Sequence, residues 1–197
     1  MDKITIPTEI KAFDPNLLEA WKKRDYSMLT QSDASDYLKS ILTFKASRSG
    51  KKRGLKRFFG EAFVATNTPM VDGWYNSYQW LIKDNCVSGY DLKSSPEEPI
   101  PYKQTFYDVA VVQHIGVENL RKFQKHSRDY ENRTGNYPKA PDLFIINEEH
   151  NFVLIEVKLP SDKINSQQED GLKLIKKYLM TKNDNPVIVK KVELTPA

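Results

Sequence analysis

Two apolar runs separated by a short polar stretch stand out in the last third of the chain. The runs are Leu143–Ile146 and Phe152–Lys158, and residues 147–151 between them are polar. Short runs that are rich in β-branched and aromatic side chains are typical of strands, and a polar break of this size is typical of a hairpin loop. The pattern therefore predicts a β-hairpin.

The pairing within this hairpin determines which side chains share a face. If Ile146 lies opposite Phe152, then Asp142 falls opposite Glu156, with the two Cβ atoms roughly 4.5–5.5 Å apart. Lys158 shares the face of Glu156, because strand side chains alternate with period two. Two carboxylates this close repel each other unless a cation lies between them, and carboxylate oxygens suit Mg²⁺ or Mn²⁺. The pattern predicts a metal site, and the alternative is a hairpin with a solvated charged face.

A helix is predicted directly after the hairpin. Asn165 suits the N-cap position, and the helix begins near Ser166. Gln168 falls on the same face as the apolar residues Leu172 and Ile175. An inward-facing glutamine needs a polar partner, which the carboxylates of the hairpin would provide. Alternatively, Gln168 only caps the end of the helix.

Helical periodicity and turn-forming residues divide the remainder of the chain. Helices are predicted at residues 15–24, at 32–42 with Ser32 or Asp33 as cap, twice within 54–83 on either side of Thr68-Pro69, and from 117 to about 128. A strand or short helix is predicted at 106–115, a loop at 132–138, a closing strand at 187–192, and irregular structure at 84–100. We therefore expect an N-terminal helical extension over residues 1–44, followed by an α/β (α+β) domain.

Residues 140–143, residues 155–164 and Gln168 together resemble the VRR-NUC branch of the PD-(D/E)xK nuclease superfamily. Within that branch they are most similar to the Fanconi-associated structure-selective nuclease domain. Leu159 stands where the family usually has glycine. The segment Gly60-Glu61-Ala62-Phe63 is similar to an upstream helix on which the family carries a glutamate, and residues 73–81 are similar to the aromatic helix after it.

The resemblance implies a restriction-endonuclease-like core, with a mixed central sheet flanked by helices, over residues 45–197. It also implies a divalent-metal-dependent DNA endonuclease or exonuclease. Asp142, Glu156 and the Val157 carbonyl would hold Mg²⁺ or Mn²⁺. Lys158 would orient the attacking water, and Gln168 would orient Lys158 or a phosphate oxygen.

Glu61 is assigned by resemblance rather than by its own pattern. It lies on the shoulder of the buried face of a predicted helix over residues 54–65, where a carboxylate reaches solvent easily. From this position alone we would expect a solvated side chain. The resemblance makes Glu61 an additional metal ligand.

A run without acidic residues, from Lys45 to Arg57, precedes that helix. Part of it, residues 47–50, has the composition of a flexible loop. Such a loop beside a metal site suits a clamp on the phosphate backbone, although a basic loop is often only solvated. The candidate DNA-binding residues are Arg48, Lys51, Lys52, Arg53, Lys56 and Arg57.

Composition narrows the setting in which this chemistry takes place. The 197 residues carry a net charge of +4 and a single cysteine, Cys86, which excludes a disulfide framework. No basic-then-apolar signal and no run of membrane-spanning length are present. We therefore expect a cytoplasmic protein that acts on DNA as a monomer or homodimer, with no membrane partner and no organic cofactor.

Three alternatives share this fold or this partner. A sequence-specific type II restriction endonuclease uses the same core, and so does a dimeric Holliday-junction resolvase. A non-enzymatic nucleic-acid-binding module would have no need of Asp142, Glu156 and Lys158. The basic residues gather in a loop that suits phosphates rather than base edges. We therefore expect structure-selective cleavage of branched, flap or ended DNA.

Overall fold

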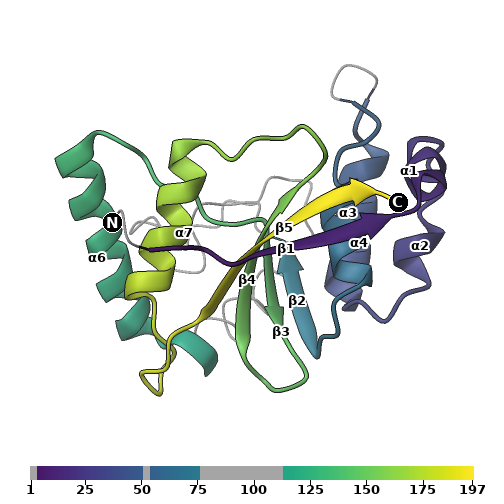
Figure 1. Cartoon of the computed structure of the whole chain (residues 1–197). Helices are drawn as coiled ribbons and strands as arrows, with labels where there is room; N and C mark the ends of the chain where they lie inside the picture. The colour runs from purple at the N-terminus through teal and green to yellow at the C-terminus, as the bar shows by residue number, and fades with distance from the viewer. Residues whose placement is uncertain (1–3, 51–53, 76–112) are drawn as a thin grey trace.

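Within the described part of the chain, five strands form one mixed sheet at the centre of the molecule (Figure 1). The computed structural model describes residues 4–50, 54–75 and 113–197. In spatial order the strands are β1 (Thr8–Phe13), β5 (Ile188–Pro196), β4 (Phe152–Lys158), β3 (Leu143–Ile146) and β2 (Asp72–Tyr75). β5 is parallel to both β1 and β4, whereas the β4–β3 and β3–β2 pairs are antiparallel.

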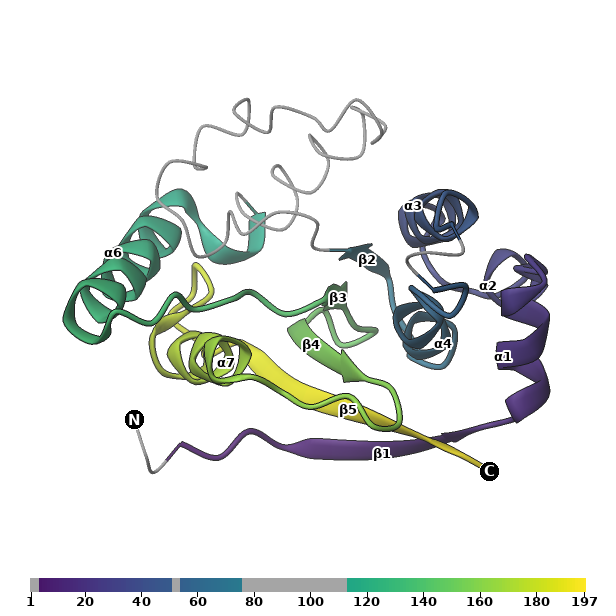
Figure 2. The same ribbon diagram turned by 90° about the horizontal axis from the view of Figure 1, so that it is seen from above.

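Helices cover both faces of this sheet (Figure 2). On one side lie α6 (Val117–Thr134) and α7 (Ser166–Tyr178). On the other lie α1 (Pro15–Lys22), α2 (Ser27–Thr30), α3 (Asp36–Ser47) and α4 (Phe59–Thr66). Most apolar side chains between these layers are buried. This arrangement confirms the predicted fold class, a mixed sheet flanked by helices.

The predicted register of the hairpin is confirmed. Ile146 pairs with Phe152, and Leu143 pairs with Ile155, so the ladder leads directly to Asp142 and Glu156. Both strands are buried along almost their whole length, because β4 lies between β3 and β5 and helices cover both faces. The charged residues at the end of this hairpin therefore extend from a rigid support.

Two strands were not predicted. β1 lies in a segment where we expected only helices, and it carries alternating polar residues because it is an edge strand paired on one side only. β2 lies where we expected the start of a helix over residues 73–81. Pairing with β3 satisfies its backbone and overrides the helical pattern of its side chains. The predicted domain boundary at residue 45 stays a prediction, but β1 places part of the N-terminal segment in the sheet.

Several helix ends differ from those predicted. α3 begins after Ser35, whose side chain accepts a hydrogen bond from the backbone N–H of Leu38, and it extends to Ser47, inside the basic run that begins at Lys45. α4 begins at Phe59 rather than at residue 54, because the preceding residues form turns. α6 extends to Thr134, where the left-handed Gly135 ends it, so the first three residues of the predicted loop at 132–138 are helical.

Other predictions fall on parts of the chain outside the described residues. These are the irregular stretch at 84–100, residues 106–112, and the second helix expected within 54–83 beyond Tyr75. Among the helices of the described residues, none has the length and apolarity needed to cross a bilayer.

Candidate active site

Asp142 and Glu156 come together where the β3–β4 hairpin ends. Asp142 lies one residue before β3, and its Oδ2 atom accepts a 2.9 Å hydrogen bond from the backbone N–H of Val157. This bond continues the ladder of the hairpin through a side chain instead of a carbonyl. It holds the Asp142 carboxylate beside the residue that follows Glu156.

Glu156 is 1% exposed, and no other acidic or basic residue of the described chain is as deeply buried. Its Oε1 atom accepts hydrogen bonds from two side chains, at 2.7 Å from Lys158 Nζ and at 2.6 Å from Gln168 Nε2. A buried carboxylate is costly unless it is paired and hydrogen-bonded, and both conditions are met here. One side chain from β4 and one from α7 thus donate to the same oxygen atom of Glu156.

Gln168 both caps α7 and contacts the hairpin, because its amide has two ends. Its backbone N–H donates to Asn165 Oδ1 at 2.9 Å, and its own Oε1 atom accepts from the Asn165 N–H at 3.2 Å, which completes a capping box. Its Nε2 group then remains to donate to Glu156. We expected Gln168 to orient Lys158 or a phosphate oxygen. It donates to Glu156 Oε1 instead, the same oxygen atom that accepts from Lys158.

Glu61 reaches the same place from α4. A Cβ atom on Gly60 would lie 3.0 Å from Val157 Cγ1 and 3.5 Å from Leu159, so α4 packs closely against the end of β4. This contact brings the partly buried Glu61 close enough for the charges of Asp142 and Glu156 to affect it. Leu159, which stands where the family usually has glycine, fills the space beside Gly60.

Burial raises the pKa of all three carboxyl groups. It raises the pKa of Glu156 to about 8, assisted by the charge of Asp142 and opposed by Lys158. It also raises the pKa of Glu61 to about 8, with further increases from Asp142 and Glu156. The pKa of Asp142 is raised by burial, although the Val157 N–H and Lys158 oppose that effect. If all three groups were ionised, the cluster would therefore carry more negative charge than its protein surroundings stabilise at neutral pH.

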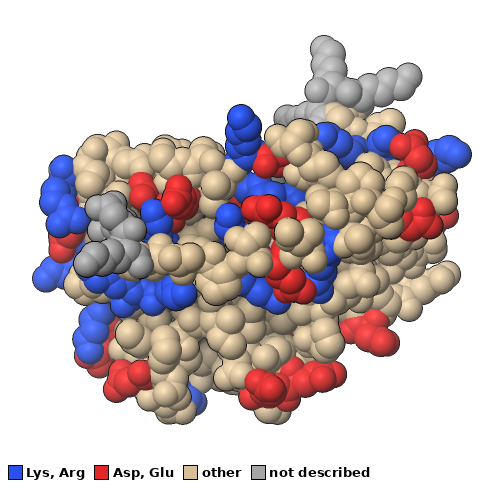
Figure 3. Space-filling model, viewed as in Figure 1, with Lys and Arg blue, Asp and Glu red and all other residues tan. Residues whose placement is uncertain are grey.

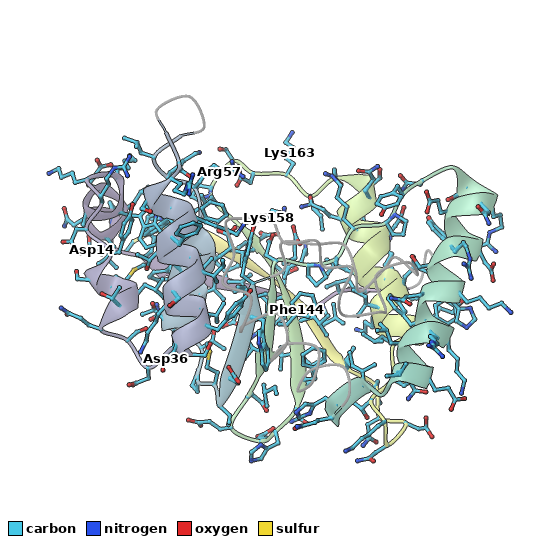
Figure 4. The ribbon with its side chains drawn as sticks, turned by 180° about the vertical axis from the view of Figure 1, so that it is seen from behind. Asp14, Asp36, Arg57, Phe144, Lys158 and Lys163 are labelled. Atoms are coloured by element: carbon cyan, nitrogen blue, oxygen red, sulfur yellow. The ribbon has the colours of Figure 1, made fainter. Side chains whose placement is uncertain are left out.

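A cavity of about 330 Å³ opens beside these groups. It is lined by residues of α4 and the turn before it, of β2, and of the end of the hairpin: Lys56, Arg57, Phe58, Gly60, Glu61, Tyr75, Asp142, Val157, Lys158, Leu159 and Asp162. Figure 4 shows Arg57, Lys158 and Lys163 at the same end of the sheet. The cavity thus combines carboxylates, cations and two aromatic rings.

The predicted DNA-binding residues do not all meet at this cavity. Lys56 and Arg57 are exposed and line it. Arg48 is exposed at the end of α3, where its guanidinium lies 5.4 Å from the ring centre of Phe44, and it does not line the cavity. Lys51, Lys52 and Arg53 lie outside the described residues. On the face seen in Figure 3, basic and acidic side chains are interspersed rather than gathered into one basic patch.

The donor atoms at this site suit a divalent cation bound in part by water. No three Asp, Glu, His or Cys side chains of the described residues are gathered tightly enough to enclose a metal ion by themselves. Mg²⁺ commonly takes only one or two protein carboxylates and keeps several waters. Asp142, Glu156 and the Val157 carbonyl would be sufficient for such an ion, with Glu61 close by.

Five residues that line the cavity were not predicted as part of the site: Phe58, Gly60, Tyr75, Leu159 and Asp162. Phe58 and Tyr75 lie in segments that were predicted to be helices. Only the turn before α4 and the strand β2 place the two rings on the cavity wall, and neither element shows in the hydrophobic pattern.

Comparison with known families agrees with this geometry. The family model of the VRR-NUC domain matches residues 82–189, more than half of the chain. Asp142, Glu156, Lys158 and Gln168 lie inside the matched range, whereas Glu61 and the basic run precede it. A search of curated proteins finds no significant match, so the closer similarity to the Fanconi-associated nuclease stays a prediction. The chain belongs to the VRR-NUC family, which indicates a nuclease-type function with DNA as the substrate.

Proposed function

We propose that this protein is a divalent-metal-dependent deoxyribonuclease that selects its substrate by DNA structure. The observation that carries the proposal is the meeting of Asp142, Glu156 and Lys158 beside a cavity that also holds Lys56 and Arg57. Carboxylates with raised pKa values suit a cation, and the basic residues suit a phosphate. A solvated charged hairpin would have no reason to bury Glu156 almost completely.

The residues of the chain take separate roles in phosphodiester hydrolysis. A bound Mg²⁺ or Mn²⁺ would supply Lewis-acid polarisation of the phosphate and lower the pKa of a water. Asp142, Glu156 and the Val157 carbonyl would hold the ion, and Glu61 would support it. Each negative charge they carry is one that the ion would offset.

Lys158 has the position required to act on the water and on the developing charge. Its side chain is 11% exposed, and it is held 2.7 Å from Glu156 while it lines the cavity. From there its ammonium group would orient the attacking water and stabilise negative charge on the phosphorane-like transition state. Gln168 acts as a positioning residue, because its amide fixes the oxygen to which Lys158 binds.

Selectivity for DNA structure rather than sequence is expected because few side chains near the cavity are suited to recognising base edges. Among the described residues that line the cavity, the exposed cations are Lys56 and Arg57, and both lie in a turn. Phosphate contacts position a nucleic acid without specifying its sequence, whereas base reading needs rigidly held side chains in a groove. We therefore expect the shape of the DNA near a branch or an end to determine where it is cut.

A panel of linear duplex, flap, nicked and four-way DNA, incubated with Mg²⁺ or Mn²⁺, tests this proposal. We expect cleavage of branched or ended DNA in preference to long uniform duplex. Discrete fragments of long linear DNA that map to one short sequence would contradict it and favour a restriction endonuclease. Cleavage of four-way DNA alone by a dimer would favour a resolvase, and binding without any cleavage would favour a non-enzymatic module.

A further inference from the structure

The backbone at Phe58 is strained. Phe58 precedes the first turn of α4 with φ 64°, in the left-handed region that a bulky side chain rarely adopts. The surrounding structure holds the residue there, because Trp21 Nε1 of α1 donates a 3.0 Å hydrogen bond to the Arg57 carbonyl. Strained residues that their surroundings hold firmly are concentrated at functional sites.

This conformation places the Phe58 ring on the wall of the active-site cavity, next to Tyr75. The two ring centres are 5.7 Å apart and the planes meet at 87°. Both side chains are only partly buried, and both line the same cavity as Asp142 and Lys158. Two rings are thus within reach of whatever occupies the cavity.

Cations accompany both rings. The Arg57 guanidinium lies 5.0 Å from the centre of the Phe58 ring, and Lys45 Nζ lies 5.8 Å from the centre of the Tyr75 ring. Aromatic rings interleaved with basic groups are the combination that binds single-stranded nucleic acid, because bases stack on the rings while the cations contact phosphates. A ring that served only the core would need neither the cations nor the strained backbone.

We propose that Phe58 and Tyr75 form a stacking platform for an unpaired base next to the scissile phosphate. This inference rests on the proposed nuclease function and narrows its substrate. A base inside a duplex is covered by its neighbours, so it must leave the stack before it can lie against a side chain. The preferred DNA would therefore carry an unpaired nucleotide at the cut site, as in a flap or a frayed end.

The test places the fluorescent base 2-aminopurine at the unpaired position of a flap substrate, and Ca²⁺ replaces Mg²⁺ so that binding is measured without cleavage. We expect the wild-type protein to quench the fluorescence. Phe58→Leu and Tyr75→Leu should each reduce the quenching and weaken flap binding about 10-fold, the scale of one lost base–aromatic contact. Phe58→Tyr keeps the ring and should behave as the wild type, and binding to blunt duplex should change less than about 2-fold in all three variants.

Two results would overturn the platform. One is unchanged quenching in both leucine variants. The other is an equal loss of flap and duplex binding, which would make the rings packing elements only. Either result together with normal cleavage by the wild type refutes the platform and leaves the nuclease proposal standing, whereas a wild type that cuts no DNA refutes the nuclease proposal itself.

Discussion

Gly171 lets α7 approach the segment that leads to Asp142. A Cβ atom at Gly171 would lie 1.8 Å from the Lys139 carbonyl oxygen and 3.0 Å from the Lys139 nitrogen. A 2.9 Å hydrogen bond from the Lys139 N–H to the Gln167 carbonyl stabilises this close contact between α7 and the segment before β3. Gly171→Ala should therefore separate α7, which carries Gln168, from the chain that carries Asp142.

The size of the effect follows from these distances. A separation of 1.8 Å is about 1.6 Å short of the 3.4 Å at which ordinary contact begins, and the obstacle is backbone that cannot rotate away. Overpacking of this kind costs about 1–3 kcal/mol, and a weakened hydrogen bond adds about 1 kcal/mol. Alanine regains about 1 kcal/mol through its helix propensity. We expect a net loss of about 2 kcal/mol, or roughly 4–8 °C in Tm.

Thermal and urea unfolding of the purified variant measure this loss, and a cleavage assay measures its consequence. A shift of this size in α7 would also carry Gln168 Nε2 out of hydrogen-bond range of Glu156, so activity should fall as well. Gly50→Ala is the matched control, because a Cβ there meets nothing within 4 Å, and its stability should stay within about 0.5 kcal/mol of the wild type. A Gly171→Ala protein as stable and active as the wild type would refute the close approach of α7.

Two further predictions concern charge. The raised pKa values of Glu61 and Glu156 stabilise the metal-free fold fully below about pH 4.5, and this stability is lost as the pH rises through about 8. The Tm of the protein in EDTA should thus fall between pH 5.5 and 8.5, and Glu156→Gln should make that fall smaller. Mn²⁺ should raise the Tm more at pH 8.5 than at pH 6. A Tm that rises with pH in EDTA would contradict the raised pKa values. Replacing Lys56 and Arg57 by alanine should weaken binding to all DNA sequences alike and reduce the slope of log affinity against log salt by roughly 0.9 per lost phosphate contact. Lys122→Ala on α6 is the control, and an unchanged slope in the double variant would show that these cations are only solvated.

The sequence was sufficient to predict the hairpin and its charged end, for a physical reason. Strands that are buried on both faces tolerate few polar residues, so the apolar runs of β3 and β4 show both strands and their register. Asp142, Glu156 and Lys158 are conspicuous because they interrupt or flank those runs. The roles of Asn165 and Gln168 at the helix end can also be recognised from the sequence, because a capping box depends only on neighbours in the chain.

Elements that depend on distant partners were not predictable in this way. β1 and β2 are strands because β5 and β3 offer them hydrogen-bonding partners, and their own side chains carry little strand signal. The left-handed turn at Phe58 depends on contacts with α1 and β2. The aromatic part of the cavity was missed for this reason, whereas the carboxylates were found.

The most direct test of the metal-dependent nuclease site is a comparison of the wild type with Asp142→Asn and Lys158→Ala on flap DNA. The wild type should cut the DNA with Mn²⁺ and should be inactive in EDTA. Both variants should keep their fold and their DNA binding but lose cleavage, because one removes a carboxylate that holds the ion and the other removes the ammonium group that orients the water. Cleavage by the wild type that persists in EDTA, or cleavage by Lys158→Ala at the wild-type rate, would contradict the account.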